Sequence, residues 1–256
     1  MHEDRTRPRS AIFPTLDSRR TLMTTAELLE ATITSQSEYA IDRSQNGFVF
    51  DNVAWADYEA MLRIVGDRPI RLTYDRGVLT IMSPLRKHDG VKSILGWLIE
   101  TLAVELDIPC ESLGSTTWKR EDLLKGIEAD ECYYFENASK LVPNQEIDLK
   151  VAPPPDLAVE VDVTSESIDR LPIYAALGVR EVWRYQQDVL EIWVLGSEGS
   201  LEKSSVSRNF PFLDMNKFVE FLHLSTSMIH SRVIKSFQAW VRTDVHSLYT
   251  EWSTKR

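Results

Sequence analysis

The alternation of apolar and acidic residues between Pro155 and Ser165 is the clearest pattern in the chain. Because successive side chains of a β-strand point to opposite faces, residues two apart share a face. One face would carry Leu157, Val159, Val161 and Val163. The other face would carry Asp156, Ala158, Glu160 and Asp162. The pattern therefore predicts a strand with one face in the core and an acidic row on the other.

Two interpretations of the acidic row follow from the residues alone. An antiparallel strand often turns one polar face to water, and the acidic row would then be solvated. Alternatively, Glu160 and Asp162, with Cα atoms roughly 6.5 to 7 Å apart, could bind one hard cation. Carboxylates this close repel one another unless a metal, a proton or a basic group neutralises them.

A second acidic strand is predicted upstream, between Gly126 and Phe135. Its alternation places Glu128, Asp130, Cys132 and Tyr134 on one face. If the two strands are neighbours, Asp130 and Glu160 form a carboxylate pair of the kind that Mg²⁺ or Mn²⁺ binds, together with substrate phosphate. The two cysteines and five histidines have no zinc-ligand spacing.

Hydrophobic periodicity predicts the other elements of the central part. Helical spacing covers residues 55–65, 91–106, 170–177 and 233–241. Strands are predicted at 110–119, 128–135, 157–163, 181–185 and 189–195, and a hairpin at 70–83 turns at Gly77. Gly178 would end the short helix. The central order of helix, three strands, helix and strand predicts an α/β (α+β) domain with a mixed central sheet flanked by helices.

The polar, weakly periodic residues 1–45 are expected to form a flexible N-terminal extension. Residues 46–200 would form the main domain, and residues 201–256 would form a C-terminal helical extension. No run of about 18 apolar residues occurs, which predicts no transmembrane helix. The N-terminus has no apolar core of a secretory signal, and Cys110 and Cys132 are expected to stay reduced in a cytoplasm.

The net charge of -10 argues against a protein that binds nucleic acid non-specifically over its whole surface. A local basic groove stays open as an alternative. The residues that could form it are Arg86, Lys87, His88 and Lys92 in one patch, and Lys119, Arg120 and Lys125 in another. Either patch could equally be a solvated surface.

The element order, with acids on the second and third strands, resembles the restriction-endonuclease-like core of the PD-(D/E)XK nuclease superfamily. More narrowly, the chain resembles the family of putative restriction endonucleases of unknown target, from about Val53 to Leu195. The segments that carry the resemblance are Trp55–Tyr58, Tyr74–Gly77, Met82–Pro84 with His88, Glu128–Asp130, Pro155–Asp156, Glu160–Asp162, and Tyr174–Val179 leading into Glu181–Trp183.

The resemblance implies a role for several residues. Asp130 is similar to the first acidic ligand of the superfamily, with Ala129 where that motif has proline, and Glu160 is similar to the acid of the (D/E)-x-K element. Asp162 occupies the lysine position of that element and could be an additional metal ligand. Arg170, from the following helix, could supply the missing positive charge. His88 could contact phosphate or shuttle a proton.

The implied activity is hydrolysis of DNA phosphodiester bonds by a Mg²⁺-dependent (or Mn²⁺-dependent) endonuclease. The resemblance also allows a homodimer. One alternative is a catalytically inactive nuclease-fold protein with a binding or regulatory role, because the motif lysine is absent. A second alternative is a metal-dependent hydrolase of a smaller phosphate ester, which a closed pocket would favour. Asp156 is expected to be structural, and Trp183, Tyr185 and Trp193 are expected in the core or an interface.

Overall fold

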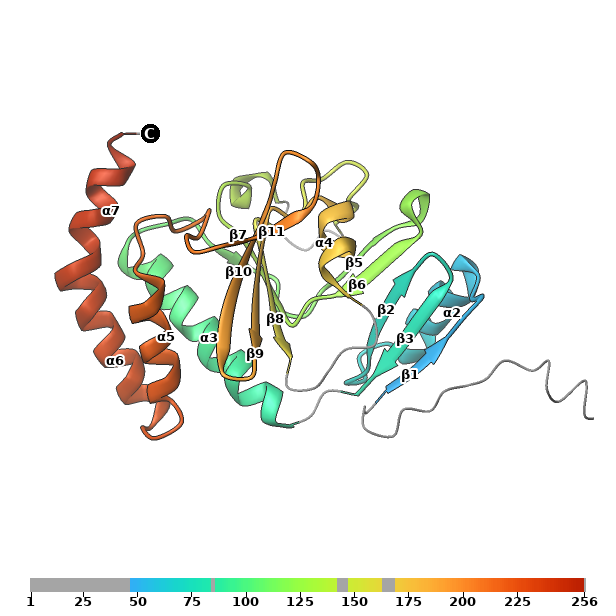
Figure 1. Cartoon of the computed structure of the whole chain (residues 1–256), viewed down its shortest axis with the longest axis horizontal. Coiled ribbons are helices and arrows are strands. Elements are labelled where there is room, and N and C mark those ends of the chain that lie inside the picture. The colour runs from blue at the N-terminus through green and yellow to red at the C-terminus, as the bar shows by residue number, and fades with distance from the viewer. Residues whose placement is uncertain (1–46, 84–85, 142–146, 163–168, 256) are drawn as a thin grey trace, which may run out of the picture. The chain divides into compact units, whose positions relative to one another are not determined.

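The computed structural model describes residues 47–83, 86–141, 147–162 and 169–255, and the side chains of residues 86–89 and 162 lie outside that description (Figure 1). The predicted N-terminal extension, residues 1–45, also lies outside the described residues. No described helix has the length and apolar character that crossing a membrane would require.

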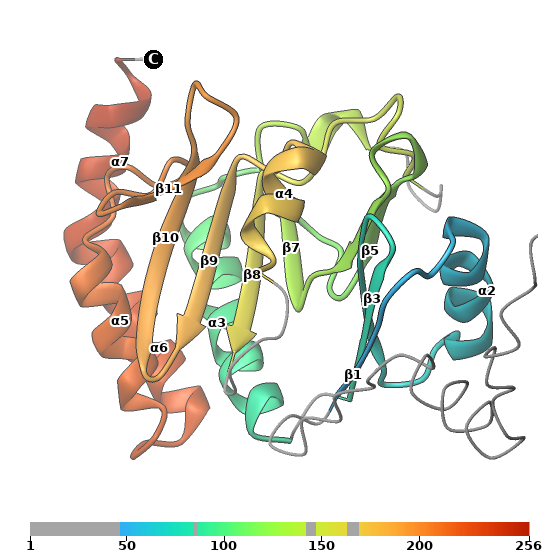
Figure 2. The same cartoon turned by 45° about the vertical axis from the view of Figure 1, so that its right-hand side comes forward.

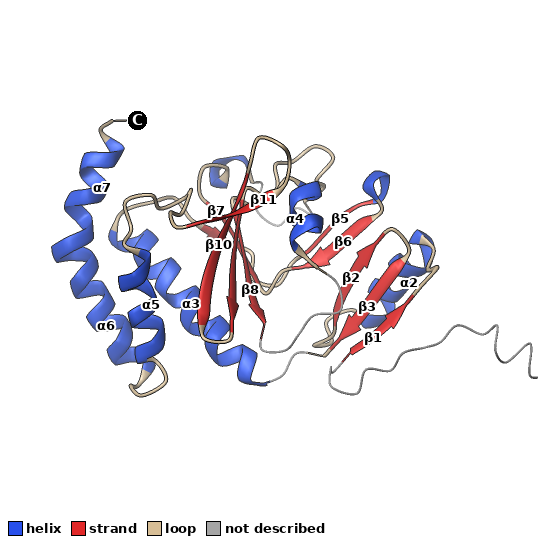
Figure 3. Ribbon diagram, in the orientation of Figure 1, coloured by secondary structure: helices blue, strands red, loops and turns tan. Residues whose placement is uncertain are grey.

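Seven strands and two α-helices follow one another in the first half of the described chain (Figure 3). In order they are β1 (Gly47–Phe50), α2 (Trp55–Val65), β2 (Arg71–Asp75), β3 (Val78–Met82), α3 (Arg86–Glu105), β4 (Glu111–Ser112), β5 (Thr117–Arg120), β6 (Lys125–Glu128) and β7 (Glu131–Tyr134). Short 3-10 turns, η1 (Glu121–Leu123) and η2 (Ala138–Lys140), follow β5 and β7.

The second half begins with the predicted acidic strand and ends in helices. Its elements are β8 (Leu157–Asp162), α4 (Leu171–Leu177), β9 (Glu181–Gln186), β10 (Val189–Leu195), β11 (Leu201–Ser204), α5 (Met215–Leu224), α6 (His230–Trp240), a π-helical turn η3 (Val241–Val245) and α7 (His246–Ser253). The helices predicted at 55–65 and 170–177 and the strand pair at 181–195 are confirmed within a residue or two.

The strands form two sheets. A five-stranded sheet has the order β1-β3-β2-β6-β5, and a six-stranded sheet has the order β11-β10-β9-β8-β7-β4. The six-stranded sheet is mixed, because β8 and β9 are parallel while its other pairs are antiparallel. Figure 2 shows α3 behind this sheet and α4 in front of it. The predicted α/β class with a mixed sheet flanked by helices is confirmed, and the five-stranded sheet adds to it.

Both faces of β8 are buried. Leu157, Val159 and Val161 pack in a core cluster with side chains of α3, α5 and α6. Ala158, on the other face, packs in a second cluster with side chains of α4. Because a parallel pair needs a crossover connection, α4 covers the face that carries the acids. The interpretation of this row as a water-facing surface is therefore wrong, since Glu160 is only 3% exposed.

Two predicted strands are each divided between the two sheets. Residues 110–119 form β4 and β5, separated by a turn in which Gly114 has φ +57°. Residues 128–135 are shared between the end of β6 and β7, so the chain passes from one sheet to the other at Ala129 and Asp130. The predicted face of Glu128, Asp130, Cys132 and Tyr134 is wrong, because Ala129 packs in the same cluster as Cys132 and Tyr134.

Turn chemistry explains several boundaries. The β2–β3 hairpin turns through Arg76 and Gly77, with φ +47° and +95°, a conformation that favours glycine at the second position. Gly178, with φ +84°, ends α4, and Pro172 lies in the first turn of that helix, where its missing N–H is harmless. These positions agree with the sequence-based expectations.

The C-terminal helices pack on the six-stranded sheet. Phe218 and Phe221 of α5 and Phe237 of α6 belong to the same core cluster as Val159 of β8. The expected domain boundaries at 45 and 200 stay predictions. Cys110 and Cys132 are free thiols, and burial raises the pKa of each to about 12, so both are protonated at neutral pH.

Candidate active site

Asp130 and Glu160 lie at the same level of two neighbouring strands. In the antiparallel register of β7 and β8, Glu131 pairs with Val159, so the preceding residue Asp130 comes opposite Glu160. The backbone N–H of Val161 donates to Asp130 Oδ2 at 2.8 Å. The backbone pairing of β7 with β8 ends at Glu131, so Asp130 contacts β8 through its side chain. This hydrogen bond holds the Asp130 carboxylate beside the acidic strand.

Glu160 is held by two residues of the crossover connection. The hydroxyl of Tyr174 donates to Glu160 Oε1, and the guanidinium of Arg170 lies 3.0 Å from the same oxygen. Arg170 also donates to the backbone carbonyl of Glu128. Burial, together with the nearby negative charge of Glu160, raises the pKa of Tyr174 well above its usual value, so Tyr174 stays a hydrogen-bond donor.

Arg71 reaches this site from β2 of the five-stranded sheet. Its guanidinium contacts the carboxylate of Glu128, lies 3.3 Å from Asp130 Oδ1, and donates to the Ala129 carbonyl at 3.2 Å. It also donates to Ser115 Oγ at 3.0 Å. Sequence reasoning missed Arg71, because a lone arginine in a hairpin strand carries no local mark of the strand that it will lie beside.

Lys92 of α3 adds a third cation to the site. Its Nζ lies 2.9 Å from Ser115 Oγ and 3.4 Å from Glu131 Oε1. Ser115 Oγ in turn donates to the Asp130 carbonyl at 3.1 Å. Burial raises the pKa of Glu131, and the charge of Lys92 partly opposes this shift. The sequence marked Lys92 only as a member of a basic patch, whereas Ser115 and Glu131 were not singled out.

The structure does not describe the side chains of two further predicted site residues. Asp162 ends β8, two residues after Glu160, and His88 belongs to the first turn of α3, but both side chains lie outside the described residues. Asp156 is four residues from Glu160, roughly 13 Å along the strand. Its carboxylate accepts the backbone N–H groups of Phe135 and Asn137, which confirms a structural role.

The donor set at Asp130 and Glu160 fits a hard divalent cation in its chemistry. Such ions bind through one or two carboxylates and keep water and phosphate as further ligands. Among the described residues, no group of three or more His, Cys, Asp or Glu side chains is arranged to hold a metal ion. The oxygens of the pair now accept hydrogen bonds or ion pairs from Val161, Arg71, Arg170 and Tyr174.

The described members of the two predicted basic patches are paired with acids. Lys119 lies 3.0 Å from Glu59, Arg120 lies 2.6 Å from Asp122, and Lys125 lies 2.7 Å from Asp75. These pairs balance much of the positive charge locally. The second patch is therefore not a free basic surface.

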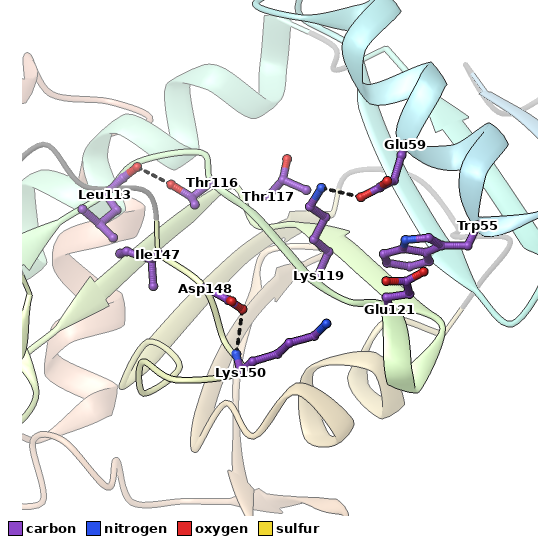
Figure 4. Close-up of a pocket in the computed structure, with 10 residues that line it drawn as sticks. All are labelled: Trp55, Glu59, Leu113, Thr116, Thr117, Lys119, Glu121, Ile147, Asp148 and Lys150. Carbon is purple, nitrogen blue, oxygen red and sulfur yellow. Dashed lines mark hydrogen bonds and ion pairs between the residues drawn. The ribbon is translucent and has the colours of Figure 1, made fainter.

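An open pocket of about 560 Å³ lies beside β5 (Figure 4). Trp55 and Glu59 of α2 line it, with Thr117 and Lys119 of β5 and the Lys150 side chain opposite them. Neither Asp130 nor Glu160 belongs to its lining. The pocket is thus distinct from the acidic pair, and it does not supply the closed phosphate-ester site that one alternative requires.

Comparison with models of known protein families shows which family the chain belongs to. The model of the Uma2 family, described as putative restriction endonuclease, matches residues 55–228. The chain belongs to this family. The Uma2 match includes Asp130, Glu160, Arg170 and Tyr174, together with Arg71 and Lys92. The predicted family membership is confirmed.

The other comparisons are sparse. No curated protein matches the chain. A crystal structure of a putative nuclease belonging to DUF820 from Anabaena variabilis is similar, with 15% sequence identity and a TM-score of 0.41. The match covers 72% of this chain and 98% of that one.

Proposed function

We propose that this Uma2 protein is a divalent-metal-dependent endonuclease that hydrolyses phosphodiester bonds of DNA. The observation that carries the proposal is the placement of Asp130 opposite Glu160 on adjacent strands, with Arg170 on Glu160. Two carboxylates beside a guanidinium are the groups that metal-assisted attack on a phosphodiester needs.

The roles of the residues follow from their chemistry. Asp130 and Glu160 would hold Mg²⁺ or Mn²⁺, which when bound polarises the phosphate and lowers the pKa of its water. Arg170 is always protonated, so it would bind phosphate oxygens and neutralise developing charge, but it is a poor proton acceptor. Tyr174 would orient Glu160 through its hydroxyl group. Asp162 as a further ligand and His88 as a phosphate or proton contact stay part of the proposal.

A second candidate is a nuclease-fold protein that no longer catalyses a reaction. It is favoured by the burial of Glu160 and by the acid partners of Lys119, Arg120 and Lys125. A protein of this kind would keep the acidic cluster neutralised by arginines and would bind its partner without turnover.

The test is cleavage of plasmid and single-stranded DNA with Mg²⁺ or Mn²⁺ by the wild type, Asp130→Asn, Glu160→Gln and the control Glu136→Gln. Glu136 pairs with Arg180 at the surface, away from the acidic pair. We expect metal-dependent cleavage to fall at least about 100-fold in Asp130→Asn and Glu160→Gln. Replacing a residue that only hydrogen-bonds to a metal ligand already lowers metal affinity or activity by about 10- to 100-fold. Circular dichroism would verify that each variant is folded.

Two results would contradict the proposal. Cleavage that Asp130→Asn and Glu160→Gln leave intact would remove the acidic pair from catalysis. A folded wild type that neither cuts any substrate nor binds Mn²⁺ in calorimetry would favour the non-catalytic candidate. Equal loss in the Glu136→Gln control would indicate a general effect of charge or stability instead of a specific site.

A further inference from the structure

We propose that Arg71 is a built-in counter-cation that competes with the divalent metal for Asp130 and thereby weakens metal binding. This inference rests on the proposed function, because it concerns the same acidic pair. Arg71 comes from β2 of the five-stranded sheet, whereas Glu160 belongs to β8 of the six-stranded sheet and Asp130 lies between β6 and β7. Its side chain is 12% exposed, and that of Asp130 is 14% exposed.

The Arg71 guanidinium contacts four partners at unequal distances. The guanidinium contacts the Glu128 carboxylate and donates to Ser115 Oγ at 3.0 Å and to the Ala129 carbonyl at 3.2 Å. Its distance of 3.3 Å to Asp130 Oδ1 is the longest of the four. Asp130 could therefore turn this oxygen toward a metal while the other three partners keep Arg71 in place.

The second oxygen of Asp130 makes such a change local. Asp130 Oδ2 accepts the Val161 N–H at 2.8 Å, and this bond does not depend on Arg71. The carboxylate thus stays beside Glu160 whichever cation its Oδ1 faces. A guanidinium that stays nearby would repel the incoming metal, because like charges at short range disfavour one another.

The charge balance gives the direction of the effect. Glu128, Asp130 and Glu160 carry three negative charges, and Arg71 and Arg170 carry two positive charges, which leaves one negative charge. Removing Arg71 leaves two. A positive unit charge about 6 Å from a bound divalent ion lowers the affinity of the site for that ion. At an effective dielectric constant of about 20 and before solvent screening, the effect is far more than tenfold. We therefore expect Arg71→Gln to bind Mn²⁺ at least about tenfold more tightly.

Without metal the same residue should stabilise the site. Arg71→Gln leaves Glu128 and Asp130 facing one another with less compensation, so the variant should unfold at a lower temperature in chelator than the wild type. Added Mn²⁺ should restore more stability to this variant than to the wild type, because at a given concentration a tighter-binding ligand stabilises the folded state more, by RT ln(1 + [L]/Kd).

The experiment measures Mn²⁺ binding by calorimetry and thermal unfolding in EDTA and in Mn²⁺ for the wild type, Arg71→Gln and Arg76→Gln. Arg76 is the matched control, because it lies in the same hairpin, pairs with Asp75 and is 71% exposed in its side chain. Tighter Mn²⁺ binding in Arg71→Gln alone, with wild-type behaviour of Arg76→Gln, supports the proposal. An Arg71→Gln protein that is unfolded in EDTA and folds on adding Mn²⁺ also supports it.

Other outcomes overturn the inference, and they separate it from the proposed function. If the wild type binds Mn²⁺ and cuts DNA while folded Arg71→Gln binds Mn²⁺ equally or more weakly, only the competition is refuted. An Arg71→Gln protein that stays unfolded in both EDTA and Mn²⁺ also refutes it, because the metal then cannot replace the guanidinium. If neither the wild type nor Arg71→Gln binds Mn²⁺, both the competition and the metal-dependent nuclease are refuted.

Discussion

Replacing Asp156 by asparagine tests whether this acid of the Pro155-Asp156 motif is structural. The residue is 2% exposed, and its carboxylate accepts three N–H groups. Oδ2 accepts the backbone N–H of Phe135 at 2.8 Å and that of Asn137 at 3.0 Å, while Oδ1 accepts Asn137 Nδ2 at 2.7 Å. An asparagine of the same shape keeps one acceptor oxygen and places an NH₂ group where the other stood.

The change cannot be absorbed by simple rotation. If the new amide oxygen faces the two backbone N–H groups, its NH₂ faces the Asn137 NH₂ group. Rotating the Asn137 amide would remove that conflict. However, Asn137 Oδ1 accepts a hydrogen bond from Lys140 Nζ at 2.6 Å, and after the rotation the Asn137 NH₂ group would face Lys140 instead. A buried donor loses its acceptor in the first arrangement, and the exposed Lys140 ammonium loses its acceptor in the second. In both, the remaining hydrogen bonds lose a charged partner.

The expected loss of stability is about 2 to 3 kcal/mol, since a hydrogen bond to a charged group contributes about 1.5 to 3 kcal/mol. For a domain of this size, that corresponds to a decrease of about 4 to 12 °C in melting temperature. Urea unfolding of Asp156→Asn would measure it. A double-mutant cycle with Lys140→Met should show a coupling of about 1 kcal/mol, because Asn137 is then free to rotate.

A loss below about 0.5 kcal/mol in Asp156→Asn, within the range of ordinary surface substitutions, would refute the hydrogen-bond reasoning. Additive effects in the cycle would refute the specific part played by Lys140. Mn²⁺ affinity should stay at the wild-type value, because Asp156 is roughly 13 Å along the strand from Glu160. A variant that lost metal binding while keeping its stability would instead make Asp156 a site residue.

Two further predictions concern the sheets. An added methyl group in Gly126→Ala would lie 2.2 Å from the Tyr58 hydroxyl oxygen, and Tyr58 is fully buried against Tyr74, so we expect a loss of about 3 kcal/mol in urea unfolding. Gly90→Ala, in open space on α3, is the control, and equal stability of both variants would contradict the clash. Burial raises the pKa of Glu191, but hydrogen bonds from Lys203, Arg184 and Trp193 outweigh this and lower it to about 2. Because the folded pKa lies below the unfolded value, the carboxylate stabilises the fold above about pH 5, and this contribution is lost as the pH falls toward 2. Glu191→Gln should thus be about 1 to 2 kcal/mol less stable at pH 7, with a difference that disappears by about pH 2, and a difference independent of pH would contradict the assignment.

The elements that local patterns define were predictable from the sequence. The apolar spacing of Leu95, Leu98 and Leu102 marks α3, and all three side chains are fully buried. The alternation from Leu157 to Val161 marks β8, and Gly178 marks the end of α4. These features depend on residues close in the chain, so their periodicity is visible without the fold.

The passage of strands between sheets was not predictable in the same way. The sequence predicted one continuous strand over residues 128–135, although β6 ends at Glu128 and β7 begins at Glu131 in another sheet. Hydrogen-bond partners on different neighbouring strands impose this break, and the sequence of the strand itself does not encode them. The burial of Glu160 likewise depends on α4, which covers the face that alternation alone would leave to water.

The candidate site was predictable in its acids and incomplete in its cations. The pairing of Asp130 with Glu160 was expected from two neighbouring acidic strands, although the predicted face of Asp130 was wrong. Arg170 followed only from the family resemblance. Arg71 of β2 reaches Asp130, and Lys92 of α3 reaches Glu131, so no spacing along the chain relates these cations to their acids. Residues that meet only through tertiary packing leave no periodic mark in the sequence.

The origin of the cations ties the assembly of the site to the packing of the whole domain. Asp130, just before β7, lies opposite Glu160 of β8, but their guanidinium partners come from β2 and from the start of α4. Charges this poorly exposed are costly unless they are paired, so each guanidinium stabilises the acidic pair once it is in place. A substitution that shifts the β2–β3 hairpin should therefore move the Arg71 charge relative to Asp130, even when the substituted residue does not contact either acid.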